Sequence, residues 1–448
     1  MFLDNQRGTQ ELKNLVYVVS GGISQRDEQC PATTPRLLVQ EACEYAFNAL
    51  GISFCHAVDL IDGIITSHAD LLFSDSHAPT MFMEHIGLPS KRLIHIEEHD
   101  AMGGLYFQEA VKQIEAGGMG MDICLAYGWE MATARLTTNG KIKFPNHLVH
   151  MNGDINTALL HIEATNATPE QIAKVSVKNH CNAAHNPYAC RKGMIDIGNG
   201  EKIPEAELTV KHMINNTAII EKPLINFYTC DTPESAAACI IANKNGLERL
   251  RRAGAKLYHS VIVSGMGQAS NNTPLPHNRS VCQYGKRVSP APSATFSSNP
   301  TQIATHQAYT AANITYPFWE IDFIELHDSC APFEIKTYED LGLCDKGKGG
   351  MFIDNGYPFL PSVNYGTAFK EFMKRRVLAV NPSGGLIACG HAGSATALRQ
   401  IIFSLWQLQG TIKNHFGSKI LQVPNARRGA VHSCTETGDI VTVSILEK

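Results

Sequence analysis

Residues 381–391, Asn-Pro-Ser-Gly-Gly-Leu-Ile-Ala-Cys-Gly-His, decide how the rest of the chain is interpreted. The proline and the two adjacent glycines predict a tight turn in which backbone N–H groups can approach a ligand closely. His391 ends the stretch, and a run of small residues leads from it into an apolar helix expected over 398–408. A histidine beside free amides at a helix start is suited to holding a carbonyl oxygen while negative charge builds on it.

The composition is typical of an ordinary globular protein. With 448 residues, of which 44% are hydrophobic and 18% charged, the chain is long enough for two or three domains. A net charge of -4 gives no electrostatic basis for binding nucleic acid or an anionic membrane. No apolar run approaches the roughly 20 residues that span a bilayer, and neither end resembles a targeting signal. We therefore expect a cytoplasmic protein, with mitochondrial and peroxisomal locations as alternatives.

The 13 cysteines are scattered and odd in number, and no Cys-x-x-Cys pair occurs. Most of them are therefore expected to be small buried side chains in a reducing compartment. Cys389, directly before the Gly-His pair, lies in an apolar run and is expected to be packed in the core. No histidine spacing is typical of a zinc site. His95 and His99 are four residues apart, but in a stretch that is predicted to be strand and turn.

The order of predicted elements indicates that the chain repeats one α/β plan, in which a strand, a glycine turn and a helix follow each other. In the first half the expected strands are 15–21, 57–67 (with its preceding turn) and 122–128, and the expected helices are 35–50 and 105–116. In the second half the expected strands are 258–264, 321–326, 429–432 and 440–446, and the expected helices are 301–312 and 398–408. The halves are placed at 1–255 and 256–448, with an inserted loop domain over 136–225 and a long surface loop over 267–300.

Three ordered motifs carry a resemblance to a known family. They are VKNH at 177–180 with NPYA at 186–189, LHDSCAPFEI at 326–335 with TYEDLGLC at 337–344, and the 381–391 stretch. Together they resemble the thiolase superfamily, closest to sterol-carrier-protein-2-type thiolases. The resemblance implies the five-layered α/β/α/β/α thiolase fold, a homodimer, and an active site between the two halves. It also implies coenzyme A as a cosubstrate, with no tightly bound cofactor and no metal.

The resemblance also assigns the family's nucleophilic cysteine to a position that is not cysteine here. That position falls on Asp100, within EEHDAMGG at 97–104, just before the glycine-led helix of the first half. An aspartate cannot form a thioester. Its carboxylate could cap the helix by accepting free N–H groups, or act as a catalytic base or as an anhydride-type nucleophile, and the sequence leaves these alternatives open.

The remaining catalytic positions are carried over one at a time. His391 matches the Gly-His-Pro histidine, whose family role is to activate the nucleophile and line an oxyanion hole. His327 matches the first residue of the His-Asp-Cys-Phe loop, which would position a water or donate to a thioester oxygen. Cys330 lies one residue beyond the loop's cysteine position and is a candidate acid/base. Cys434 matches the C-terminal Cys-x-Gly loop, although bulky residues replace most of that loop's glycines.

The substrate and coenzyme A contacts are expected from the glycine turn, through Asn381, Ser383, Gly384, Gly385 and Gly390. No P-loop or Gly-x-Gly-x-x-Gly sequence is present to cradle a nucleotide phosphate. Coenzyme A phosphates would then depend on the loop domain and on basic residues, of which Lys174, Lys178 and Arg191 are candidates.

These features favour a divergent thiolase-like acyltransferase that acts on acyl-CoA thioesters and forms or breaks a C–C bond through an enolate in an oxyanion hole. An oxyanion hole without a nucleophile also suits a decarboxylase or retro-aldolase that forms no acyl-enzyme, and such relatives work beside a small OB-fold partner. A third hypothesis is a non-catalytic acyl-CoA- or lipid-binding subunit of a hetero-oligomer, since both the nucleophile and the C-terminal glycines are missing.

Overall fold

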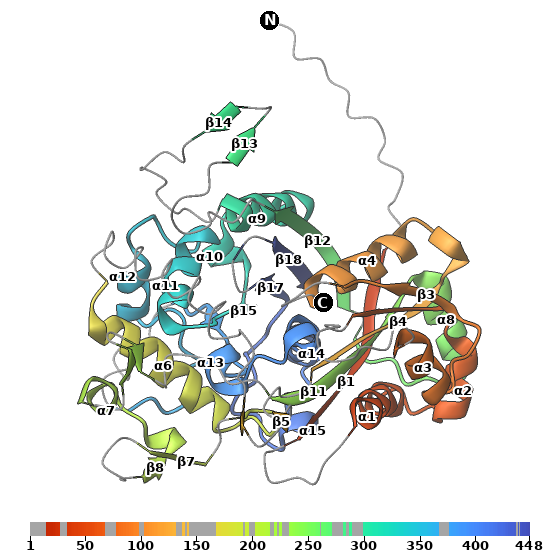
Figure 1. The fold of residues 1–448 in the computed structure, drawn as a ribbon, viewed down its shortest axis with the longest axis horizontal. Coiled ribbons are helices and arrows are strands. Elements are labelled where there is room, and N and C mark those ends of the chain that lie inside the picture. The colour runs from red at the N-terminus through yellow and green to blue at the C-terminus, as the bar shows by residue number, and fades with distance from the viewer. Residues whose placement is uncertain are drawn as a thin grey trace, which may run out of the picture.

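The computed structural model describes residues 15–26, 34–67, 78–97, 103–130, 137–138, 141–142, 167–190, 193–196, 202–215, 219–221, 224–225, 233–259, 261–270, 281–283, 286–288, 299–366, 376–435, 438 and 440–448. Within these ranges the chain forms a mixed α/β structure built on one ten-stranded sheet (Figure 1). None of the described helices is long and apolar enough to cross a membrane.

The ten strands divide into two arrays of the same topology. In the first array the spatial order is β1 (Tyr17–Arg26), β11 (Glu234–Ala242), β4 (Ile123–Glu130), β2 (Gly63–Ser67) and β3 (Arg92–His95). In the second it is β12 (Val261–Ser270), β18 (Ile440–Glu447), β17 (Arg428–Cys434), β15 (Phe323–Leu326) and β16 (Ala379–Val380). If the five strands of each array are numbered in sequence order, their spatial order in both arrays is first, fifth, fourth, second and third.

The strand directions repeat as well. In both arrays the first two pairings are antiparallel and the next two are parallel. The arrays meet where β1 pairs briefly with β12, through Tyr17 with Ile262 and Val18 with Val261. This repetition confirms the pseudo-duplicated α/β fold that the sequence predicted.

Helices form three layers around the two arrays. α1 (Pro35–Asn48) covers β1 and β11 on the outside, and α9 (Asn299–Ala311) covers β12 and β18. Between the arrays lie α4 (Gly103–Glu115) and α14 (Thr396–Gln409), each of which contacts strands of both (Figure 1). α14 is buried over 396–408, as expected for a central helix that is largely apolar around its circumference.

Two glycines allow the central layer to pack closely. A Cβ on Gly103 would approach the backbone nitrogen of Leu398 to 2.7 Å, and one on Gly104 would come to 1.9 Å from Thr442 Oγ1. α4 can therefore lie against α14 and β18 only because its first turn has no side chains there. The same two glycines led the sequence-based prediction of this helix.

The remaining elements are short or lie at the edges of the arrays. The helices are α2 (Phe54–Leu60), α3 (Ala78–His85), α6 (Pro169–Ala183), α7 (Val210–Asn215), α8 (Lys244–Arg252), α10 (Pro317–Glu320), α11 (Ala331–Asp340), α12 (Gly349–Asp354), α13 (Gly385–Cys389) and α15 (Ile412–Phe416). Small hairpins pair β5 (Thr137–Thr138) with β6 (Lys141–Ile142), β7 (Met194–Asp196) with β8 (Lys202–Pro204), β9 (Ile219–Glu221) with β10 (Leu224–Ile225), and β13 (Val281–Gln283) with β14 (Lys286–Val288).

The helix α6 joins the loop region to the second half of the chain, because it packs against α11, α12 and α13. Its start is defined by a capping box, in which Thr168 Oγ1 accepts from the Gln171 backbone and the Gln171 side chain accepts from the Thr168 backbone. Pro169 occupies the first helical turn, where its missing N–H costs nothing.

Several predicted elements differ from the structure. Residues 57–60 belong to helix α2, because Ser53 starts a short helix in the stretch that was predicted to be strand and turn. β12 begins at Val261 and runs to Ser270, so the predicted surface loop over 267–300 opens with strand residues and contains the β13–β14 hairpin. The boundary placed at 255/256 lies between α8 and β12 and stays a prediction.

Candidate active site

Two loops bring His327 and His391 together at one edge of the second array. His327 follows the end of β15, and His391 follows α13 through Gly390, which has a φ of +91°. The two imidazole rings lie 5.1 Å apart between centroids and are nearly perpendicular, at 83°. β15 and β16 are parallel neighbours, so the loops after their carboxyl ends meet at the same sheet edge. The structure therefore places side by side the two histidines that the sequence singled out.

The tautomer of His391 follows from its contacts. Its Nδ1 accepts a hydrogen bond from the Gly393 backbone N–H at 3.0 Å and lies 3.2 Å from Thr396 Oγ1. A backbone N–H can only donate, so Nδ1 carries no proton and a neutral ring holds its proton on Nε2. His391 is thus prepared to donate a hydrogen bond from Nε2 to an oxygen.

His327 is fully buried, and neither ring nitrogen has a hydrogen-bond partner within the described part of the chain. Burial, with the neighbouring His391 and His432, lowers the pKa of His327 well below its usual range. The ring is therefore neutral, with one donor and one acceptor nitrogen. A buried polar group that makes no hydrogen bond costs roughly 1–3 kcal/mol. His327 thus has one donor and one acceptor nitrogen that no described residue uses, which makes it a candidate for substrate contact.

A third imidazole, which the sequence did not single out, completes the cluster. His432 lies in β17 directly opposite Leu326, and its Nδ1 is 3.4 Å from the His327 backbone nitrogen. Burial lowers the pKa of His432 to about 3. His432 begins the His-Ser-Cys segment to which Cys434 belongs, but only the β15–β17 register shows that it adjoins His327.

The two candidate cysteines are both buried at the ends of elements near the histidines. Cys330 immediately precedes α11, three residues after His327. Cys434 ends β17 two residues after His432, so the two side chains leave the same face of the strand. Neither cysteine forms a disulfide bond. Proton transfer by either thiol stays a prediction.

Asp100 lies outside the described residues, and the helix that it would precede, α4, begins at Gly103. The choice between a helix cap and a catalytic group at this position therefore stays open. Arg191 also lies outside the described residues.

The amides expected to face a ligand bind a carboxylate of the chain instead. In the first turn of α13, Leu386 N donates to Asp328 Oδ1 at 2.7 Å and Ile387 N lies 3.4 Å from Asp328 Oδ2. The expectation of free amides beside His391 was therefore wrong at these two positions. Its physical basis was right, since the N–H groups at a helix start seek an acceptor, but the acceptor is the carboxyl group of Asp328, whose pKa is raised by burial and by Glu334.

The glycines of the turn are explained by close contacts within the chain. A Cβ on Gly385 would come to 2.3 Å from Asp328 Oδ2, and one on Gly384 would come to 2.7 Å from the Cβ of Ala183 in α6. A Cβ on Gly390 would approach Cys190 Sγ to 2.5 Å. Contact of these glycines with coenzyme A stays a prediction.

Asn381 and Ser383 likewise use their side chains inside the protein. Asn381 accepts from Leu326 N at 2.8 Å and donates to Glu334 Oε2 at 3.0 Å. Ser383 donates through Oγ to Glu325 Oε2 at 2.6 Å, and its N–H donates to Oε1 of the same residue. Burial raises the pKa of Glu325 to about 8. These contacts fix the turn to β15, and a further contact with substrate stays a prediction.

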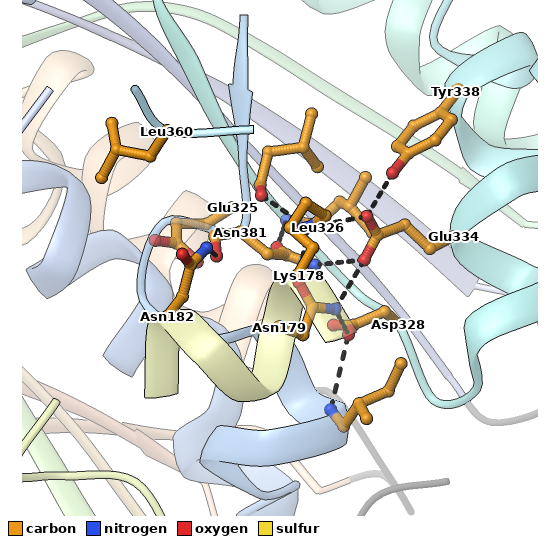
Figure 2. Close-up of polar contacts among 12 residues, drawn as sticks. Lys178, Asn179, Asn182, Glu325, Leu326, Asp328, Glu334, Tyr338, Leu360 and Asn381 are labelled. Atoms are coloured by element: carbon orange, nitrogen blue, oxygen red, sulfur yellow. Dashed lines mark hydrogen bonds and ion pairs between the residues drawn. The ribbon is translucent and has the colours of Figure 1, made fainter. Parts of the chain in front are cut away.

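Lys178 is not a surface cation. It is fully buried in α6 and forms an ion pair with Glu334 at 2.9 Å, as Figure 2 shows. Its expected role in binding coenzyme A phosphate was wrong, because the ammonium is enclosed within the protein and paired with Glu334. Lys174 is partly exposed and pairs with Asp354 at 2.5 Å. Cys389, as expected, is packed in the core.

Within the described ranges, no group of three or more histidine, cysteine, aspartate or glutamate side chains is arranged to hold a metal ion. The candidate site therefore consists of neutral imidazoles and buried thiols, supported by the buried hydrogen bonds and ion pair given above.

The fold and this arrangement can be compared with known proteins. The "Thiolase C-terminal domain-like" family matches residues 283–448. An acetyl-CoA acetyltransferase of Methanothermobacter thermautotrophicus is 26% identical over 85% of this chain and 86% of its own length. Sterol carrier protein 2 of Gallus gallus is 25% identical over 90% of this chain and 66% of its own length. Among solved structures, the Ltp2-ChsH2(DUF35) aldolase superposes with a TM-score of 0.70 at 16% identity, covering 97% of this chain and 98% of that one.

These matches show what the chain is similar to. Residues 283–448 match a thiolase C-terminal family, and most of the chain is similar to thiolase-superfamily proteins that include sterol carrier protein 2.

Proposed function

We propose that the chain is a thiolase-like enzyme that binds an acyl-CoA thioester and forms or breaks a C–C bond next to the thioester carbonyl. The reaction passes through an enolate, whose oxygen accepts hydrogen bonds from His391 and His327. Thiolysis and Claisen condensation are the acyltransferase form of this chemistry. Coenzyme A is then a cosubstrate and leaves with the product.

The observation that carries this proposal is the pairing of two neutral imidazoles, one of which has a defined tautomer. His391 presents a proton on Nε2, because its Nδ1 is occupied by the Gly393 N–H, and His327 lies 5.1 Å away with both ring nitrogens available. In a buried site, neutral donors stabilise an oxyanion without the cost of a second charge. Neutral imidazoles serve this role where an imidazolium would protonate the enolate.

A specific observation also favours a second function, C–C cleavage without an acyl-enzyme. The sequence contains no cysteine between Cys55 and Cys124, and this stretch includes the whole segment that leads α4. Decarboxylation and retro-aldol cleavage need an enolate site but no nucleophile. The similar Ltp2-ChsH2(DUF35) aldolase is named for two components. A small OB-fold partner is accordingly part of this second proposal, and a homodimer is part of the first.

Mass spectrometry separates the two functions. Pure protein is incubated with acetoacetyl-CoA plus free coenzyme A, with malonyl-CoA and with acetyl-CoA, and both products and covalent adducts are followed. Turnover with a cysteine-linked acyl adduct supports the acyltransferase, with Cys330 or Cys434 as candidate attachment sites. Turnover without an adduct supports the lyase.

In either case His391→Ala should reduce turnover by about 100-fold or more, the usual cost of losing one oxyanion donor. His415→Gln is the matched control, because His415 is a histidine of α15 stacked on Trp406 and outside the imidazole cluster. Turnover that is unchanged in His391→Ala would contradict both functions. Thioester binding without turnover would favour the non-catalytic binding subunit instead.

A further inference from the structure

Beneath the two histidines lies a buried polar network that joins three segments distant in sequence. Figure 2 shows its members, which come from α6, from the loop and helix after β15, and from the turn before α13. All are fully or almost fully buried. A buried charged network is costly unless every member is paired, so its retention calls for an explanation.

The carboxylate of Asp328 is the point at which the three segments meet. It accepts from Asn179 Nδ2 of α6 at 2.7 Å and from Leu386 N of α13 at 2.7 Å. Asp328 directly follows His327, and α13 ends at Cys389, two residues before His391. One side chain therefore connects the backbone of one histidine to the helix that leads to the other.

Other contacts hold Asp328 in place. Asn179 Nδ2 also donates to Glu334 Oε2 at 2.8 Å, and Glu334 pairs with Lys178 at 2.9 Å. The Tyr338 hydroxyl donates to Glu334 as well. Lys178 donates to the Val380 carbonyl at 2.7 Å, just before the turn. The network thus fixes α6, α11 and the turn to one another, and Asp328 extends this frame to α13.

The turn is shaped to receive this carboxylate. Gly385 has a φ of +61°, and a Cβ there would lie 2.3 Å from Asp328 Oδ2. A side chain at residue 385 would therefore push α13 away from Asp328 even if every charge were kept. The same close contact therefore requires both the carboxyl group of Asp328 and the absence of a side chain at Gly385.

We propose that Asp328 is a positioning residue that sets the distance and angle between the imidazoles of His327 and His391. This inference rests on the proposed enolate site and adds the device that assembles it. The carboxylate acts through α13 and its own backbone and touches no substrate. A displacement of about 1 Å between catalytic groups can cost about 100-fold in rate.

The test compares Asp328→Asn with a matched control, Asp322→Asn. The control also removes a carboxylate that accepts from two backbone N–H groups, those of Arg427 and Arg428, but Asp322 lies just before β15, at the end of the strand opposite to His327. Asp328→Asn should lower kcat by about 100-fold with KM changed less than threefold, because transition-state contacts are lost while ground-state binding is kept. Asp322→Asn should leave both constants within about threefold.

A second readout does not need activity. In protein with ¹³C-labelled histidine, the ring protons of His327 and His391 should show a mutual NOE, given the 5.1 Å separation of the rings. Asp328→Asn should weaken this NOE several-fold, and Asp322→Asn should keep it. If no thioester is turned over, so that the proposed function fails, the NOE still decides whether Asp328 positions the rings.

Gly385→Ala provides the second variant and decides the question if Asp328→Asn does not fold. It should reproduce the loss of kcat and of the NOE, and the double variant should be no worse than either single one, since both break one contact. The inference is overturned if the ring–ring NOE persists in these variants, or if they raise KM while kcat is kept.

Discussion

At the scale of single residues, the site depends on histidines that are neutral because they are buried. Burial lowers the pKa of His432 to about 3 and the pKa of His327 well below its usual range. An unfolded histidine has a pKa near 6.5, so folding lowers the pKa of both histidines. Each of them therefore contributes folding stability that is fully present above pH 6.5 and is lost as the pH falls. Glu325 has the opposite pH dependence, because burial raises its pKa to about 8. Its contribution to folding stability is lost as the pH rises toward that value.

We therefore expect His432→Gln to change the pH dependence of stability. Between pH 7.5 and pH 5, the wild type should lose about 2 kcal/mol of unfolding free energy through His432 alone, and the variant should not. Urea unfolding of variant and wild type at both pH values measures this change in unfolding free energy. Glu325→Gln should alter the pH-dependent change in the direction opposite to His432→Gln. An unchanged difference in His432→Gln would contradict a depressed pKa for this histidine.

The sequence singled out His391 and His327 through motif and local context, and the structure places the two rings side by side, while their catalytic roles stay predictions. The sequence did not single out His432, and it wrongly placed Lys178 at the surface. His432 becomes part of the cluster only through the register of β15 with β17, and Lys178 is buried only through its pairing with Glu334 across distant segments. Neither contact leaves a local sequence pattern.

At the scale of elements, the central helices α4 and α14 connect the two halves and carry the site. Gln400 of α14 donates to the Leu326 carbonyl at 3.0 Å and so holds the end of β15 just before His327. At the other side, Ser394 Oγ accepts from Trp129 N at 3.2 Å and ties the start of α14 to β4. The site is thus supported from both arrays.

Close packing of α4 gives a direct test of this arrangement. Gly104→Ala would place a Cβ 1.9 Å from Thr442 Oγ1, so α4 must shift away from β18. We expect a loss of roughly 1–3 kcal/mol of unfolding free energy, the usual cost of overpacking, although alanine favours helix. Lys112→Ala, on the exposed face of the same helix, should stay within about 0.5 kcal/mol. Equal stability of the two variants in denaturant unfolding would contradict the packing described here.

Elements with strong local signals were predicted well, and those defined by their neighbours were not. α1 was found because Pro35 and the Thr34 cap mark its start and its apolar positions are periodic. β11, with the sequence ESAAACIIA, was missed because alanine favours helix. Its small side chains are needed where the strand is covered by α1 on one face and by α14 on the other.

At the scale of the whole molecule, the repeat of strand order and direction explains why the candidate active site lies where it does. Each half offers a helix start at the carboxyl edge of its parallel strands, and the central layer brings these starts together. The motifs sufficed to predict this architecture. They could not predict which chemistry the first half contributes, because Asp100, the position to which the resemblance assigns the cysteine, lies outside the described residues.

Enolate formation by the two histidines can be measured without knowing the natural substrate. Acetyl-CoA is incubated with the protein in D₂O, and deuterium in the acetyl methyl group is measured by mass spectrometry. We expect exchange well above the buffer rate, a loss of about 100-fold in His391→Ala, and unchanged exchange in His415→Gln. Binding of acetyl-CoA without any exchange, or exchange that survives in His391→Ala, would contradict an oxyanion site formed by the two histidines.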